Sequence, residues 1–224
     1  MRTIYQYLLS SIGAEYKTVK TIKTSERGCV SLLQNIQNGT RLIFRHYRGN
    51  GEVYRKLLGV SFRNLPQVME VAESGGMVAV LEEYIQGDSL AYLLKGALFT
   101  PAEAREITLQ LCNALLVLHA MGAVHRDIKP ENVIVRGSEP VPIDLDASRI
   151  FKNGTNQDTQ ILGTTGYAAP EQYGITQTDE RADIYSLGVL LNIMLTGKHP
   201  AKELASGWLL YTYEAADDIK RGDN

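Results

Sequence analysis

Short apolar runs separated by polar and turn-forming residues fill the first third of the chain, a pattern that predicts β-strands. Asn38-Gly39 lies between two of these runs and readily adopts the positive φ angles of a tight hairpin turn. The segment from Glu52 to Leu58 predicts a short helix after the hairpin, and residues 86–88 predict a turn. The runs that predict strands occupy residues 16–22, 31–33, 41–44 and 77–81.

The remainder of the chain is patterned for helices. Thr100 can cap a helix whose first position suits Pro101, and Glu103 completes a capping box. Gly122 is suited to end this helix. One apolar face is built by Ile107, Leu111, Leu115 and Leu118. A β-rich part therefore meets an α-rich part near residues 83–88, and a junction of this kind favours a ligand cleft.

Composition narrows the class of protein. With 224 residues, 44% of them hydrophobic, the chain can bury a substantial core, which excludes wholesale disorder. The formal net charge of −2 leaves no positive excess for nucleic acid or for an anionic membrane surface. The two cysteines, Cys29 and Cys112, are too few for a disulfide scaffold or a Cys-rich zinc site, so a reducing compartment is expected.

Neither apolar stretch of the chain predicts a membrane segment. The start of the chain lacks the clean apolar region of a signal peptide. The run at residues 184–195 is interrupted by polar residues and is shorter than the roughly 20 apolar residues that span a bilayer, so it predicts a buried helix. We therefore expect a cytoplasmic protein with neither a membrane segment nor a nucleic-acid partner.

The residues that carry chemistry are concentrated between His125 and Asp144. Asp127 offers a carboxylate acceptor and Lys129 a cation two residues later. Asn132 and Asp144 supply oxygen atoms of the kind that a hard divalent cation prefers. Together these groups suit Mg²⁺–nucleotide chemistry, in which a carboxylate accepts a hydroxyl proton. The alternative is a polar turn network that binds no metal.

The same stretch resembles the protein kinase family, specifically its bacterial serine/threonine members. His125-Arg126-Asp127-Ile128-Lys129-Pro130-Glu131-Asn132 matches the catalytic loop of kinases, with Lys129 typical of the serine/threonine type. Further matches follow it in the family's order, and the resemblance extends from about residue 16 to about residue 200. They are the DFG position at 144–146, the end of the activation segment at 163–171 and the helix motif at 183–188, and the resemblance implies that residues 83–85 are the hinge.

The resemblance implies an α+β fold in two lobes. Residues 1–85 would form a small β-rich N-lobe, with a five-stranded antiparallel sheet and one main helix. Residues 86–224 would form a larger helical C-lobe that ends before the helices that usually complete it. An incomplete lobe would expose an apolar patch, and a homodimer is therefore one further expectation.

The resemblance also assigns roles to individual residues. Asp127 would be the catalytic base, Lys129 would neutralise the transferring γ-phosphoryl group, and Thr164 would steady both. Asn132 and Asp144 would bind Mg²⁺, or Mn²⁺ in its place. ATP would be bound by Gly28, Val30, Arg45, Glu52, Glu83 and Ile85. Arg126 would receive a phosphate of the activation segment, and Thr155 and Thr159 are candidate autophosphorylation sites.

Three departures from the family pattern concern activity. The phosphate-covering loop keeps only Gly28 and Val30 of the pattern GxGxxGxV, which predicts weak ATP binding. Arg45 stands where the family has a lysine, with Glu52 as its expected partner and Lys20 or Lys23 as compensating cations. A solvated ion pair at a strand edge is the alternative for Arg45 and Glu52, and an ordinary hairpin glycine is the alternative for Gly28. Asp146 replaces the glycine of the DFG position.

The leading function is ATP-dependent phosphorylation of serine or threonine on a protein substrate. The alternative is a catalytically impaired pseudokinase that acts as a binding or scaffolding module, which the degenerate loop and Arg45 favour. A small-molecule phosphotransferase fits less well, because residues 164–171 resemble an activation segment that contacts protein substrates.

Overall fold

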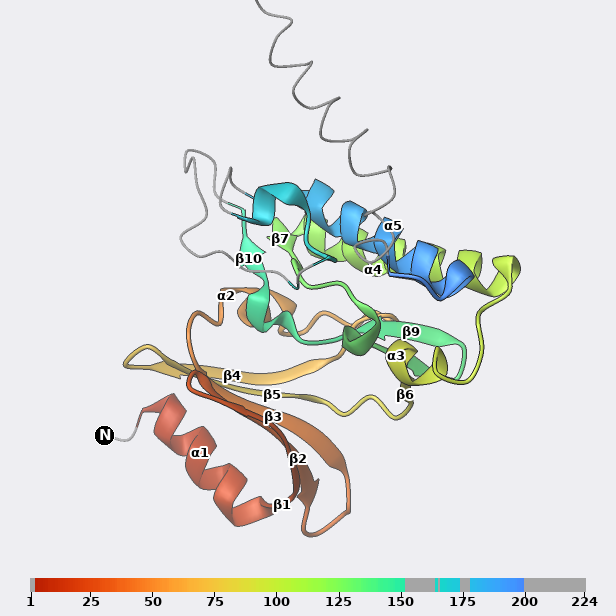
Figure 1. Ribbon diagram of the computed structural model, residues 1–224. Helices are drawn as coiled ribbons and strands as arrows, with labels where there is room; N and C mark the ends of the chain where they lie inside the picture. Colours follow the sequence, from red (N-terminus) through yellow and green to blue (C-terminus); the bar gives the residue numbers. More distant parts are fainter. Residues whose placement is uncertain (1–2, 152–163, 165, 174–177, 200–224) are drawn as a thin grey trace, which may run out of the picture.

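The computed structural model describes residues 3–151, 164, 166–173 and 178–199. Figure 1 shows a twisted β-sheet with a helix on one face and, beyond its other face, a second body that contains the two long helices. This arrangement confirms the predicted α+β fold with a β-rich N-lobe and a helical second lobe. Thr155 and Thr159, the candidate modification sites, lie outside the described residues.

The N-lobe sheet is antiparallel throughout and has the strand order β1-β2-β3-β5-β4. The hairpin predicted at Asn38-Gly39 joins β2 and β3, with Gly39 at φ 75°. The strands are longer than their apolar runs, since backbone pairing continues into polar residues at their ends. Their bounds are β1 Tyr16–Ser25, β2 Gly28–Asn35, β3 Arg41–Arg48, β4 Val68–Ser74 and β5 Met77–Glu83.

Helix α1 (Ile4–Glu15) covers the outer face of this sheet and was not predicted (Figure 1). Thr3 and Gln6 form its capping box. Leu8 is 2% exposed and packs with Ala72 and Ala79 of the sheet. The signal was present in the sequence, because Tyr5, Leu8 and Ile12 repeat at spacings of three and four.

Helix α2 (Glu52–Leu57) lies on the opposite face of the sheet, toward the second lobe. It confirms the short helix predicted from Glu52 to Leu58. Its buried side chains are those of Val53, Tyr54 and Leu57, of which Tyr54 is 1% exposed. The tyrosine hydroxyl therefore faces the junction of the lobes.

The second lobe is built around α4 (Pro101–Ala120) and α5 (Glu180–Thr196), which pack against each other. The predicted capping box is confirmed, since Thr100 N donates to Glu103 Oε2 at 2.8 Å and Glu103 N donates to Thr100 Oγ1 at 3.3 Å. Gly122 follows the end of α4 at φ 70°, as expected of a helix terminator. Within the described residues, no helix combines the length and apolar character needed to cross a membrane.

Short elements before and after α4 complete the second lobe, and those between α4 and α5 carry the loops with the candidate site residues. Strands β8 and β9 form a hairpin with β6 alongside, and β7 pairs with β10. The division expected at residue 85 falls in the segment between β5 and β6. The short elements are β6 Asp88–Ser89, α3 Leu90–Leu93, β7 Ala123–Val124, β8 Val133–Arg136, β9 Glu139–Pro142 and β10 Arg149–Ile150, with 3₁₀ turns at Pro130–Asn132, Leu145–Ala147 and Pro170–Tyr173.

Candidate active site

The loop after β7 is held in an unusual backbone conformation by groups distant in sequence. Arg126 has φ 71°, a left-handed angle that is uncommon for a residue with a side chain. His125 N and Arg126 N each donate to a carboxylate oxygen of Asp183 at 2.8 Å, and Asp183 is fully buried in α5. Gln172 Nε2 donates to Arg126 O at 2.8 Å. These bonds fix the backbone immediately before Asp127.

Four of the predicted site residues meet in one hydrogen-bonded cluster. Lys129 Nζ donates to Asp127 Oδ2 and to Thr164 Oγ1, both at 2.7 Å. Thr164 Oγ1 donates to Asp127 Oδ1 at 2.7 Å. Asn132 Nδ2 donates to Asp127 Oδ2 at 2.7 Å and to Asp127 O at 2.9 Å. The carboxylate of Asp127 is thus oriented through both of its oxygens.

Asp144 follows β9 and also adopts a left-handed conformation, with φ 70°. Ile143 N donates to Asn132 O at 2.8 Å, so the backbone brings Asp144 beside the Asp127 cluster. Leu145 is buried, and the Asp146 carboxylate turns back toward the sheet. Tyr54 Oη donates to Asp146 Oδ1 at 2.9 Å. The carboxylate of Asp146, which stands where the DFG pattern has glycine, is therefore part of the hydrogen-bond network between the lobes.

Arg45 on β3 links the sheet to these carboxylates. Its Nε donates to Glu82 Oε1 at 2.6 Å, and its Nη1 donates to Asp144 Oδ1 at 2.8 Å and to Asp146 Oδ2 at 3.2 Å. The residue is 4% exposed. The expected pairing with Glu52 is wrong, because Tyr54 rather than Glu52 lies on the buried face of α2. The solvated strand-edge alternative is wrong as well. The sequence analysis did not single out Glu82.

These charges shift one another's pKa values in directions that follow from burial and proximity. Burial alone would lower the pKa of Arg45, but Glu82 and the neighbouring aspartates raise it well above its ordinary value. Burial alone would raise the pKa of Asp144, but Arg45 and Lys23 prevail and lower it to about 2. Burial raises the pKa of Asp146 despite the charge of Arg45. Asp144 is therefore ionised at any physiological pH.

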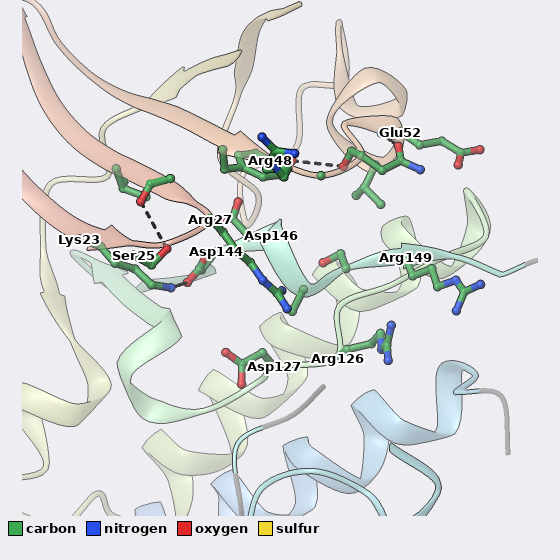
Figure 2. Close-up of a pocket in the computed structure, with 18 of the residues that line it drawn as sticks. Lys23, Ser25, Arg27, Arg48, Glu52, Arg126, Asp127, Asp144, Asp146 and Arg149 are labelled. Atoms are coloured by element: carbon green, nitrogen blue, oxygen red, sulfur yellow. Dashed lines mark hydrogen bonds and ion pairs between the residues drawn. The ribbon is translucent and has the colours of Figure 1, made fainter. Parts of the chain in front are cut away.

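A cleft between the lobes has two regions that share lining residues. One region, of about 640 Å³, is lined by Val30, Glu83 and Ile85, together with Lys129, Asn132 and Thr164. The other, of about 670 Å³, lies under the β1–β2 turn and reaches Asp127. Figure 2 shows this second region, into which Arg27 points from the turn. Lys23, Val30 and Asp144 line both regions.

A family model described as the protein kinase domain matches residues 18–210 of the chain. The chain belongs to the protein kinase family.

Bacterial serine/threonine kinases are among the proteins most similar to this kinase domain. It is 32% identical over 154 residues to the serine/threonine-protein kinase pkn2 of Myxococcus xanthus, covering 65% of the chain and 19% of that protein. It is 34% identical over 137 residues to the probable serine/threonine-protein kinase PknB of Corynebacterium glutamicum, covering 58% and 21%. It is 33% identical over 150 residues to the serine/threonine-protein kinase PkaA of Streptomyces coelicolor, covering 64% and 28%. The matched part is at most 28% of each relative's length.

Gly28, the glycine that the phosphate-covering loop retains, is required by local packing. A Cβ atom on Gly28 would lie 2.1 Å from His46 O and 2.5 Å from Tyr47 Cα. Because those backbone atoms belong to β3, no larger residue fits between the two strands at this point. This contact supports the hairpin-glycine alternative for Gly28, and a contact of Gly28 with phosphate stays a prediction.

Glu83, at the start of the segment expected to be the hinge, is held by residues of both lobes. Glu83 N donates to Gln67 O at 2.8 Å, and Arg136 Nη1 donates to Glu83 Oε1 at 2.6 Å. Ile85 is 6% exposed and lines the cleft. The structure thus places Val30, Glu83 and Ile85, which the resemblance assigned to ATP binding, around one region of the cleft.

The donor set at Asn132 and Asp144 fits the divalent cation that kinases use. Asn132 donates its amide hydrogens to Asp127, which leaves its side-chain oxygen as a potential ligand. Asp144 adds an ionised carboxylate. No group of three or more His, Cys, Asp or Glu residues suited to a metal occurs in the described part of the chain. Two protein oxygens nevertheless suit Mg²⁺, because phosphate oxygens and water complete its coordination.

Proposed function

We propose that this domain transfers the γ-phosphoryl group of ATP to a serine or threonine hydroxyl of a protein. The single observation that carries this proposal is the Asp127 cluster, in which Lys129, Asn132 and Thr164 orient one carboxylate at the cleft. This arrangement supplies a positioned proton acceptor beside a cation, which is what phosphoryl transfer to a hydroxyl requires.

The reaction assigns a separate task to each group. The substrate oxygen attacks the γ-phosphorus, the bond from that phosphorus to the β,γ-bridging oxygen breaks, and ADP leaves. Asp127 accepts the hydroxyl proton, while Lys129 offsets charge on the transferring group. Asn132 and Asp144 would hold Mg²⁺, or Mn²⁺ in its place. The bound ion supplies electrostatic stabilisation of the phosphate oxygens.

The region of the cleft at the hinge is the proposed adenosine site. Val30 and Ile85 offer apolar contact to a flat base, and the backbone from Glu83 to Ile85 offers hydrogen-bonding groups. The region under the β1–β2 turn is the proposed site of the phosphates and of the substrate hydroxyl, since Asp127 and Asp144 line it.

An autophosphorylation assay with γ-labelled ATP and Mg²⁺ or Mn²⁺ tests the proposal. Asp127→Ala should lower incorporation at least about a hundredfold, because a positioned general base contributes that much or more. Nucleotide binding should persist in this variant, because the hinge region of the cleft does not include Asp127. The matched control is Asp88→Ala, a carboxylate on β6, which should label like the wild type.

The pseudokinase alternative is favoured by one specific observation. Asp144 Oδ1 and Oδ2 already accept from Arg45 and Lys23, so a metal ion must compete with two cations for this carboxylate. Folded wild-type protein that incorporates no label with either metal ion would support a binding module. Equal labelling of the wild type and Asp127→Ala would remove Asp127 from the role of base.

A further inference from the structure

Two cations face Asp144, and they differ in their freedom to move. The Arg45 side chain is 5% exposed and is engaged through both Nε and Nη1. The Lys23 side chain is 57% exposed, and its Nζ lies 3.3 Å from Asp144 Oδ2. Figure 2 shows Lys23 reaching this carboxylate from the strand that leads into the β1–β2 turn.

Arg45 is held in place by the partner that it neutralises. Glu82 is 4% exposed, so movement of Arg45 toward a ligand would leave a buried carboxylate without its cation. The Nη1 atom of Arg45 also bridges the two aspartates. Arg45 therefore serves to anchor the acidic groups, and its guanidinium is poorly placed to turn toward a phosphate.

The backbone of β1 aims Lys23 into the cleft. Ile22 and Lys23 are consecutive residues, yet both line the same region of the cleft. A regular strand would direct them to opposite faces. The pairing of β1 with β2 is irregular between Thr21 and Lys23, and a bulge of this kind redirects side chains. Lys23 also borders both regions of the cleft, the place where a nucleotide would pass from base to phosphates.

We propose that Lys23 is the cation that binds the nucleotide phosphates, in place of the lysine that Arg45 replaces. On nucleotide binding, the Lys23 ammonium group leaves Asp144 Oδ2 and donates to a phosphate oxygen. Asp144 would then be free to help hold the divalent ion, which would offset charge on the phosphates. Arg45 stays with Glu82 throughout. This inference rests on the nucleotide binding proposed above, and it selects Lys23 over Lys20 as the compensating residue.

The test measures binding rather than turnover, by titration calorimetry with Mg²⁺ and a non-hydrolysable ATP analogue, and separately with adenosine. Lys23→Met should weaken binding of the analogue by roughly tenfold to a hundredfold, as expected for the loss of one charge-assisted hydrogen bond. Binding of adenosine should not change, because adenosine has no phosphate. Lys23→Arg should keep most of the affinity for the analogue, since the charge remains.

Two further lysines of the same strand provide the comparison. Lys17→Met is the matched control and should bind both ligands like the wild type, because Lys17 lies at the far end of β1, opposite Gln34. Lys23→Met binding the analogue as tightly as the wild type would overturn the proposal, as would an equal loss in Lys20→Met. If the wild-type protein bound both ligands and Lys23→Met bound the analogue equally well, only the role of Lys23 would be refuted. If the wild-type protein bound neither ligand, the proposed nucleotide binding would be refuted, and the role of Lys23 would be refuted with it.

Discussion

The partner of Arg45 follows from strand pairing, although no sequence motif points to it. In the register of β3 and β5, Arg45 lies opposite Val80, and Glu82 is two residues further along β5. Residues at this diagonal share a face of the sheet and lie within reach of long side chains. A glutamate at the end of an otherwise apolar strand was the available signal. It was missed because the family pattern directed attention to the helix after β3.

A double-mutant cycle on Arg45 and Glu82 tests this pairing. Arg45→Met should lower the free energy of unfolding by about 3–5 kcal/mol, because it leaves the buried Glu82 carboxylate without its cation. Glu82→Met should lower it by less, because Arg45 keeps its bonds to Asp144 and Asp146. The double variant should lose at least about 1 kcal/mol less than the sum of the two. Chemical denaturation followed by circular dichroism provides the three values, and strict additivity would show that the pair is not coupled.

The residues of the catalytic cluster were predictable to different degrees. Asp127, Lys129 and Asn132 lie within six consecutive residues, so the sequence places them close together. Thr164 is distant in sequence and was found only through the family motif. Asp183 and Gln172, which hold the loop backbone, had no assigned role, because a buried side chain that bonds a backbone group distant in sequence leaves no local pattern.

At the level of elements, local signals predicted well wherever a short pattern decides the structure. The capping box at Thr100, the hairpin at Asn38-Gly39 and the terminator at Gly122 are each confirmed. Helix α1 was missed because its apolar positions were considered only as a signal peptide. The helix contacts the strand that carries a site residue. Tyr5 Oη of α1 lies 2.5 Å from His46 Nε2 on β3, and the adjacent Arg45 faces the cleft from the other side of that strand.

Replacement of Leu8 by alanine measures how firmly α1 is docked. The variant should lose about 2–5 kcal/mol of unfolding free energy, because Leu8 is 2% exposed and its removal leaves a cavity against Ala72 and Ala79. Ile4→Ala on the same helix is the control and should change stability by less than about 0.5 kcal/mol, since Ile4 is 79% exposed. Thermal denaturation in which both variants match the wild type would show that α1 does not stabilise the sheet.

For the molecule as a whole, the lobes are joined by polar contacts on several sides of the cleft. Lys56 on α2 donates to Met121 O at 2.6 Å, and Asn64 Nδ2 donates to Pro140 O at 2.9 Å. Arg45 and Lys23 add the bonds to Asp144. These contacts pair residues far apart in sequence, so periodicity predicted a β-rich part and an α-rich part but none of the contacts that join them.

The stability of the whole domain should fall as the pH drops below 6.5. Burial lowers the pKa of His125 from 6.5, so the unfolded chain binds a proton in this range that the folded chain does not. The contribution of His125 to the free energy of unfolding is fully present above pH 6.5. It decreases as the pH falls toward the pKa of His125 in the folded protein, with a slope of at most about 1.4 kcal/mol per pH unit. Urea denaturation at a series of pH values between about 5 and 8 measures this slope.

His125→Asn provides the comparison for this measurement. The variant lacks the titrating imidazole, so its stability should depend less steeply on pH over the same range. Its absolute stability has no bearing on the conclusion, because only the slopes are compared. Parallel profiles for the two proteins would assign the acid sensitivity to other groups.

The left-handed backbone at Arg126 and Asp144 sets backbone strain against side-chain pairing. Such a conformation costs a residue with a side chain about 1–3 kcal/mol, and glycine would adopt it with little strain. Glycine at position 144 would therefore relax the backbone, but it would also remove the carboxylate that pairs with the buried Arg45. Selection or design for heat resistance alone would therefore gain little from glycine here, because the lost ion pair opposes the relieved strain.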